Sequence, residues 1–187
     1  MLNYTSPIKD SKSYNDLTIK EIGPIIKLNL RGEKREFLST VGKTLNMILP
    51  TEANTSSSSE KLTAIWLSPD EWMIFSNNIT EKNNNSYELE EILYNNISKK
   101  NFGSVTDVTD QFVMINFNGT KIFELFSFGS PFDFNQFKKK KGSTTQTIIN
   151  HIDVIIHHKD NNNVNLFVRR SFSEHLWSWV KDCASRL

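Results

Sequence analysis

The spacing of apolar residues changes several times along this chain, and each spacing predicts a helix or a strand. Residues 25–30 partly alternate between apolar and polar and end at Gly32, which predicts a strand. Residues 37–48 then carry apolar side chains at helical spacing, and Ile48 is the last member of this apolar face. The Leu-Pro pair that follows is expected to end the helix, because proline cannot continue helical hydrogen bonding.

A hairpin and a second helix are predicted next. Two short apolar runs, 63–67 and 72–75, are separated by the sequence Ser-Pro-Asp-Glu, whose proline and aspartate favour a tight turn. After an Asn-rich loop, Ser86 is expected to cap a helix with glutamates in its first turn. Strands follow at 105–108 and 112–117.

The order of the elements then recurs in the second half of the chain. Asn-Phe-Asn-Gly at 116–119 echoes Asn-Leu-Arg-Gly at 29–32, and each opens a helical segment that ends before a proline. Apolar runs predict strands at 145–149, 152–157 and 165–169, followed by a last helix. We therefore predict an α+β fold of two ferredoxin-like halves, each with the order β-α-β-β-α-β, produced by an internal duplication.

The predicted domain covers residues 23–187, with two pseudo-repeats at about 23–109 and 110–187. A chain of 187 residues is long enough to bury one good core or two small halves. Residues 1–22 are polar with few apolar anchors, which predicts a flexible N-terminal arm outside the core.

The last helix has the clearest sequence signals. Ser171 and Glu174 stand three positions apart, as in a capping box, and an apolar stripe follows that includes Cys183. At about 100° per residue Trp177 falls beside that stripe and not within it. Trp177 is therefore expected to be available to a partner, and Trp177→Ala to weaken assembly more than it lowers the melting temperature of the free chain.

Composition and charge exclude several classes of protein. Lys and Arg number 22 and Asp and Glu 21, so the net charge of +1 gives no general attraction to nucleic acid or membranes. The single cysteine excludes an internal disulfide and suits a reducing compartment. No run approaches the ~18 apolar residues of a membrane span, and the first residues lack the apolar core of a secretory signal. A soluble, cytoplasmic protein is expected.

No catalytic, cofactor-binding or metal site is predicted from the polar residues. The four histidines lack metal-ligand spacing, and Cys183 on an apolar stripe is expected to be an inert core thiol. The lysine run at 138–141 lacks the glycine pattern of a phosphate-binding loop. It remains either a solvated loop or a docking element for an acidic partner surface.

Phenylalanines are concentrated in one stretch of the second half. Six of them fall within residues 123–137, more than one helix face can bury. Either the helix and the following loop both line the core, or part of the stretch is an apolar patch that another subunit covers. The predicted subunit-interface residues are Phe132, Phe134, Phe137 and Trp177.

The sequence Trp-Leu-Ser-Pro-Asp-Glu-Trp-Met at 66–73 resembles the hairpin of the gamma subunits of heterotetrameric sarcosine oxidase, although Ser68 stands where those subunits carry glycine. The resemblance covers about residues 25–184. Further similar segments lie at 49–50, 107–119, 130–133, 146–147 and 168–177.

This resemblance implies a fold similar to the folate-binding domain of the glycine-cleavage aminomethyltransferase. It implies a complex with alpha, beta and delta subunits that oxidises sarcosine to glycine and passes a one-carbon unit to tetrahydrofolate. FAD, FMN, NAD and tetrahydrofolate are then expected on the partner subunits, and this chain is expected to be a non-catalytic structural subunit.

Two alternative functions remain open. The chain could itself be a folate-binding domain that assists one-carbon transfer, for which Asp107 or Asp133 would supply the carboxylate at the pterin. It could also be a free-standing adaptor in one-carbon metabolism, stable without partners.

Overall fold

The computed structural model describes residues 4–80 and 87–187 and divides the chain into two compact units. The first unit contains Pro24–Asp110, and the second contains Thr5–Gly23 together with Gln111–Leu187. The predicted cap Ser86 and the first three residues of the predicted arm lie outside the described residues.

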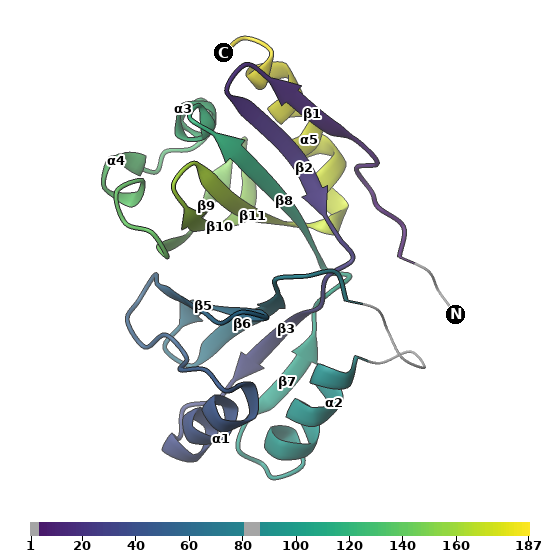
Figure 1. Ribbon diagram of the computed structural model, residues 1–187, viewed down its shortest axis with the longest axis vertical. Coiled ribbons are helices and arrows are strands. Elements are labelled where there is room, and N and C mark those ends of the chain that lie inside the picture. The colour runs from purple at the N-terminus through teal and green to yellow at the C-terminus, as the bar shows by residue number, and fades with distance from the viewer. Residues whose placement is uncertain (1–3, 81–86) are drawn as a thin grey trace. The chain divides into compact units, whose positions relative to one another are not determined.

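The first unit is an antiparallel sheet with helices on one face (Figure 1). Its strand order is β4-β5-β6-β3-β7, the neighbour relations of a ferredoxin-like sheet with β4 added at one edge. Its elements are β3 (Lys27–Arg31), α1 (Arg35–Leu45), β4 (Ser56–Ser58), β5 (Leu62–Ser68), β6 (Glu71–Ser76), α2 (Glu88–Leu93), a π-helical turn (Tyr94–Ser98) and β7 (Ser104–Asp107).

The core of this unit lies between the sheet and its helices. Leu28 and Leu30 on β3 and Phe37 and Val41 on α1 are fully buried in one cluster. Gly32 follows the strand where the Phe37 ring packs, and a Cβ at Gly32 would lie 2.5 Å from that ring. A side chain at this position would therefore displace the ring from the core.

The second unit contains a six-stranded antiparallel sheet of order β1-β2-β8-β11-β10-β9. Its core contains side chains from strands β2, β8, β9, β10 and β11 and from all three helices. Its elements are β1 (Ser11–Tyr14), β2 (Leu17–Ile22), β8 (Phe112–Gly119), α3 (Ile122–Ser127), α4 (Phe134–Phe137), β9 (Thr144–Ile149), β10 (Ile152–Asp160), β11 (Asn163–Arg169), a 3-10 turn (Arg170–Phe172) and α5 (Ser173–Ala184).

The N-terminal segment corrects the prediction of a flexible arm. Strand β2 pairs along its whole length with β8, from Leu17 opposite Gly119 to Ile22 opposite Met114. Leu17 and Ile19 alternate with exposed residues and point into the core. The arm was predicted because β2 carries few apolar residues, but a strand with one buried face needs only every second residue to be apolar.

Five strands of the second sheet correspond to the five of the first, with β1 added at one edge, which confirms the predicted two-part α+β fold. In the order β9-β10-β11-β8-β2, the second sheet repeats the order β4-β5-β6-β3-β7 of the first. The predicted order β-α-β-β-α-β for the second half is corrected, because no strand follows α5. The N-terminal strand β2 takes the place of that last strand.

Polar contacts repeat with the strands. The side-chain amide of Asn29 on β3 donates to Glu71 Oε1 on β6 at 2.6 Å. At the corresponding place in the second sheet, Asn116 on β8 donates to Asn163 Oδ1 on β11 at 2.8 Å. The echo between 29–32 and 116–119 therefore marks equivalent strands that make equivalent hydrogen bonds.

The predicted capping box at the last helix is wrong. The 3-10 turn contains Ser171, and α5 begins at Ser173, whose hydroxyl donates to Arg170 O at 2.7 Å. The buried face of α5 consists of Ser173, Leu176, Trp177, Val180 and Ala184, so Trp177, with 4% of its surface exposed, lies within that face and not beside it.

Candidate functional site

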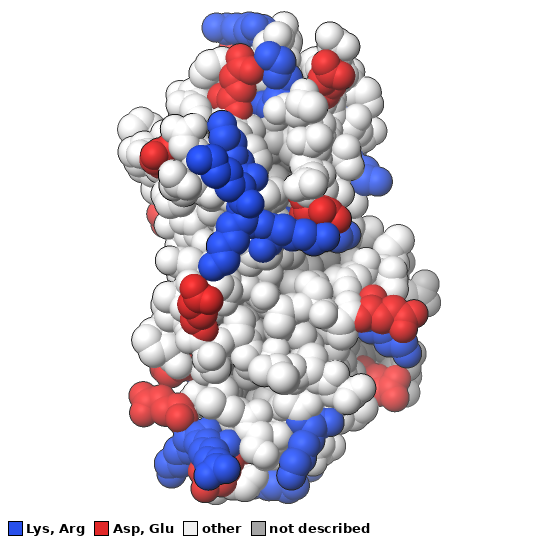
Figure 2. Space-filling view, turned by 60° about the vertical axis from the view of Figure 1, so that its left-hand side comes forward, with Lys and Arg blue, Asp and Glu red and all other residues white. Residues whose placement is uncertain are grey.

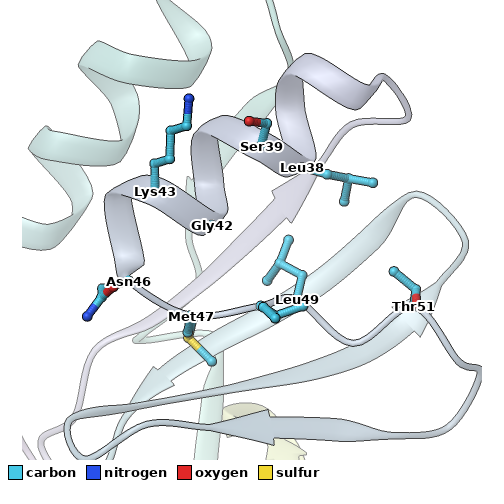
Figure 3. Close-up of a pocket in the computed structure, with 9 residues that line it drawn as sticks. Leu38, Ser39, Gly42, Lys43, Asn46, Met47, Leu49 and Thr51 are labelled. Atoms are coloured by element: carbon cyan, nitrogen blue, oxygen red, sulfur yellow. The ribbon is translucent and has the colours of Figure 1, made fainter.

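The end of α1 and the segment that follows it form an open pocket of about 520 Å³ in the first unit (Figure 3). The pocket lies between the last turns of the helix and the chain leading to β4. Its lining residues are Leu38, Ser39, Gly42, Lys43, Asn46, Met47, Ile48, Leu49 and Thr51. Apolar side chains therefore contribute much of its surface, and Lys43 contributes the one charged group of this lining.

The helix ends earlier than its apolar spacing predicts. Asn46 adopts a left-handed backbone conformation with φ of 50°, and Met47 N donates to Gly42 O at 3.1 Å. This turn ends α1 at Leu45. Ile48, predicted to lie on the buried face of the helix, is instead 85% exposed.

Hydrogen bonds hold the segment after the helix at Ile48 and at Pro50. The hydroxyl of Ser57 donates to Ile48 O at 2.6 Å, and the indole N–H of Trp72 donates to Pro50 O at 2.7 Å. Trp72 is itself buried and packs its ring 5.7 Å from Phe37. An exposed isoleucine is thus presented on a segment that hydrogen bonds tie to the sheet.

The four predicted interface residues lie in the second unit, and the structure brings three of them into its core. Phe134, Phe137 and Trp177 are 4%, 7% and 4% exposed, whereas Phe132 is partly buried and packs against the cluster. Their role at an interface stays a prediction. Phe132 is the member of the four with the largest surface left for a partner.

Five of the six phenylalanines between 123 and 137 form one aromatic cluster, and the sixth, Phe128, is 55% exposed. Phe123 packs edge-on to Phe126 and to Phe137, and Phe132 packs edge-on to Phe134 at a centroid distance of 5.0 Å. The ring of His158 lies 5.5 Å from that of Phe123. Edge-to-face contacts of this kind add about 0.5–1.5 kcal/mol each beyond burial, so the cluster fixes the short helix α4 against the sheet.

The two carboxylates considered for a folate-assisting role each accept a local backbone hydrogen bond. Asp107 Oδ1 accepts from Thr109 N at 2.8 Å, and Asp133 Oδ1 accepts from Asn135 N at 2.9 Å, which caps α4. The two residues belong to different units. Each has a role in local structure that accounts for an aspartate at its position.

A polar row crosses the helix-free face of the second sheet. Register places Thr144, His157, Asn165 and Asn116 opposite one another on four adjacent strands. Thr144, His157 and Asn165 are buried, and Asn116 donates to Asn165 Oδ1 at 2.8 Å. Burial lowers the pKa of His157 from 6.5 to about 3, with smaller contributions from the charges of Lys159 and His158.

Metal ligands, a reactive thiol and membrane-spanning helices were not expected from the sequence, and the described residues bear on each of these. Across residues 4–80 and 87–187, no group of three or more His, Cys, Asp and Glu side chains is placed to hold a metal ion. Cys183 is partly buried, and burial raises the pKa of its thiol, which disfavours the reactive thiolate. In the same part of the chain, no helix is long and apolar enough to cross a membrane.

Comparison with known proteins gives one family and two informative structures. The family described as "Sarcosine oxidase, gamma subunit family" matches residues 31–186 of the chain. The structure is similar to the heterotetrameric sarcosine oxidase from Corynebacterium sp. U-96 in complex with pyrrole 2-carboxylate, at a TM-score of 0.79 and 19% identity over 91% of this chain and 84% of that chain. No curated protein sequence matches the chain.

The second structure is the glycine cleavage system aminomethyltransferase T from Bartonella henselae. It is similar at a TM-score of 0.59 and 12% identity, over 88% of this chain and 45% of that chain. At these identities both likenesses concern the fold. They agree with the duplicated sheet and helix arrangement described above.

Proposed function

Because the chain belongs to the sarcosine oxidase gamma subunit family, we propose that it is a non-catalytic structural subunit of a heterotetrameric sarcosine oxidase. The complex would oxidise sarcosine to glycine and pass the one-carbon unit to tetrahydrofolate. Its alpha, beta and delta subunits would be the partners of this chain and would carry FAD, FMN, NAD and tetrahydrofolate. The complex would work in the cytoplasm.

The observation that carries this proposal is the family match over residues 31–186, and the exposed Ile48 beside the pocket after α1 offers one contact to a partner. Burying an isoleucine side chain contributes about 1.5–3 kcal/mol. Its backbone carbonyl is already held by Ser57, so a partner that covers Ile48 does not have to order the segment first. We propose that the pocket-lining segment and Ile48 form one contact of the subunit interface.

Phe132 is proposed as a second contact, on the second unit. It is partly buried against Phe134 and Phe137, so its ring is held in place by the cluster beneath it. Phe134, Phe137 and Trp177 would then support the interface from the core. A standard interface of about 1,600 Å² would extend well beyond either residue.

The test is assembly of the complex with an Ile48→Asp variant. Coexpression with the three partner subunits should give a complex that contains the wild-type chain, and Ile48→Asp should reduce its recovery at least about tenfold, the effect of 1.4 kcal/mol. Ile79→Asp is the matched control, since Ile79 lies in the same unit and is 68% exposed. Both variants should keep the melting temperature of the free chain, because neither side chain is in the core.

Two results would count against the proposal. Normal recovery of Ile48→Asp would exclude this surface from the interface. A wild-type chain that does not associate with the other subunits would refute the structural-subunit function and return attention to a free-standing adaptor.

A further inference from the structure

Four consecutive exposed lysines, Lys138 to Lys141, follow α4 in the second unit. Exposed Lys159 on β10 belongs to the same region, because His158 exchanges backbone hydrogen bonds with Gly142 and Ser143 at the end of the run. Lys141 pairs with Asp160 at 2.9 Å. We call Lys138, Lys139, Lys140, Lys141 and Lys159 the lysine patch. Figure 2 shows a contiguous group of basic side chains on the face that it draws.

The backbone of the lysine patch is ordered by hydrogen bonds. The N–H groups of Lys138, Lys139 and Lys140 donate to carbonyls of α4 at 2.9 to 3.2 Å. The imidazole Nδ1–H of His158 donates to Lys140 O at 3.0 Å. The lysines therefore extend from a fixed turn, whereas a solvated lysine run is commonly carried by flexible chain.

The aromatic cluster anchors that turn from below. Phe134 and Phe137 of α4 are buried, and Phe137 packs against the rings of Phe123 and His158. Neighbouring ammonium groups repel each other, which opposes such a fixed arrangement. The buried rings stabilise the turn against this repulsion, so the charges are held together before any partner arrives.

The charge of the patch differs from that of the chain. The patch carries five lysines, of which Lys141 pairs with Asp160, on a chain whose net charge is only +1. The remainder of the chain is therefore net negative. An anionic partner would be attracted to this region and not to the molecule as a whole.

The chemistry of the patch favours an acidic protein surface. Lysine ammoniums on flexible stems can each reach a separate carboxylate, whereas a single phosphate is held best by arginine forks or convergent backbone N–H groups. The phenylalanines beneath the patch are packed in the core, so they are not placed to stack on bases of single-stranded nucleic acid.

We propose that the lysine patch docks on an acidic surface of a partner subunit and steers that subunit during assembly. This inference rests on the structural-subunit function proposed above. It concerns a surface other than the contacts at Ile48 and Phe132, and it states that the partner surface there is acidic. Electrostatic steering of this kind raises association rates by about 10- to 1,000-fold at low salt.

The experiment measures the association rate of the full chain with the other three subunits over a range of salt concentrations. The variant K138E/K139E reverses two charges of the patch. The control K99E/K100E makes the same change on another ordered turn, since Lys99 and Lys100 are exposed and donate their backbone N–H groups to Tyr94 O and Ile97 O. Thermal melting establishes that each variant is folded.

We expect K138E/K139E to associate at least about tenfold more slowly than wild type at low salt. The two rates should converge at about 1 M salt, where the screening length falls to about 3 Å. The control should stay within about twofold of wild type at every salt concentration.

Three results would overturn the inference. Equal slowing by both variants would mean that only the total charge matters, and equal rates for wild type and K138E/K139E would mean that the patch does not contact the partner. Tight binding of a single-stranded oligonucleotide that K138E/K139E abolishes would assign the patch to nucleic acid. A wild-type chain that does not associate at any salt concentration refutes the proposed complex, so that outcome is distinguishable from failure of the patch alone.

Discussion

The buried imidazole of His157 predicts a loss of folding stability between neutral and mildly acidic pH. His157 is 2% exposed, and burial holds its pKa in the folded protein at about 3, against 6.5 for an unperturbed histidine. The unfolded chain therefore binds a proton at a pH where the folded chain does not. Stability from this group is fully present above pH 6.5 and is lost as the pH falls toward 3.

Linkage gives the size of this effect. With these two pKa values, lowering the pH from 7 to 5 reduces the free energy of unfolding by about 2 kcal/mol. Other groups also titrate in this range, so the quantity to compare is the pH-dependent change in wild type and in His157→Gln. Glutamine does not titrate, and any constant cost of the substitution cancels in the difference between the two pH values.

The assay is urea unfolding of the free chain at pH 7 and pH 5, followed by tryptophan fluorescence. We expect wild type to lose about 2 kcal/mol more than His157→Gln over this interval. His175→Gln serves as the control, because His175 is exposed on α5 and should leave the wild-type change intact. Losses for wild type and His157→Gln that agree within about 0.5 kcal/mol would refute the claim that burial keeps this imidazole neutral.

Two further substitutions test the packing. Trp177→Ala should destabilise the free chain by about 3–5 kcal/mol in urea unfolding, because the ring is in the core. A loss of stability below about 1 kcal/mol together with loss of assembly would instead support the expectation that Trp177 contacts a partner subunit. Gly119→Ala should destabilise by more than about 2 kcal/mol, since φ is +142° and a Cβ would lie 1.9 Å from Asp16 O. Gly42→Ala, where the nearest atom outside the helix is 3.3 Å away, should change stability by less than about 1 kcal/mol in either direction.

Local signals predicted the β5–β6 hairpin of the first unit, but neither its edge strand β4 nor the end of α1. The Ser-Pro-Asp-Glu turn specified the β5–β6 hairpin, and the structure adds that Ser68 donates to Asp70 while Arg31 pairs with the same aspartate. The turn of the hairpin depends on residues close in sequence and could be predicted locally, whereas the Arg31–Asp70 pair joins positions 39 apart and could not.

The second unit could not be predicted from local signals alone, because its last strand comes from the other end of the chain. Pairing of β2 with β8 joins residues almost a hundred positions apart, and no local pattern encodes such a partner. The segment carries only Leu17 and Ile19 as fully buried apolar residues. The predicted order β-α-β-β-α-β requires a strand after α5, whereas the sheet is completed by the N-terminal hairpin.

The burial of Ile48 and of Trp177 was mispredicted. Ile48 has helical spacing with the apolar face of α1, but the left-handed Asn46 ends the helix first. Trp177 was placed beside a stripe that runs through Cys183, whereas the buried face of α5 runs through Leu176, Trp177, Val180 and Ala184. For Ile48, a difference of three residues at the helix end exchanges core and surface, and helix ends are the least certain part of a sequence-based prediction.

The duplication connects the two proposed contact surfaces. In the correspondence of the sheets, β4 matches β9 and β3 matches β8, so the segment between α1 and β4 is equivalent to the segment between α3 and β9. The first of these segments carries Ile48 and its pocket, and the second carries α4 and the lysine run. The same connection has thus acquired an apolar surface in one half and a basic one in the other. Loops on a rigid scaffold tolerate such changes better than strands do, because their side chains are not required by the core.

The contrast between the apolar and the basic surface predicts different kinetic effects. Ile48→Asp should lower the lifetime of the assembled complex, whereas K138E/K139E should lower its rate of formation, since apolar burial acts mainly on dissociation and exposed charge mainly on encounter.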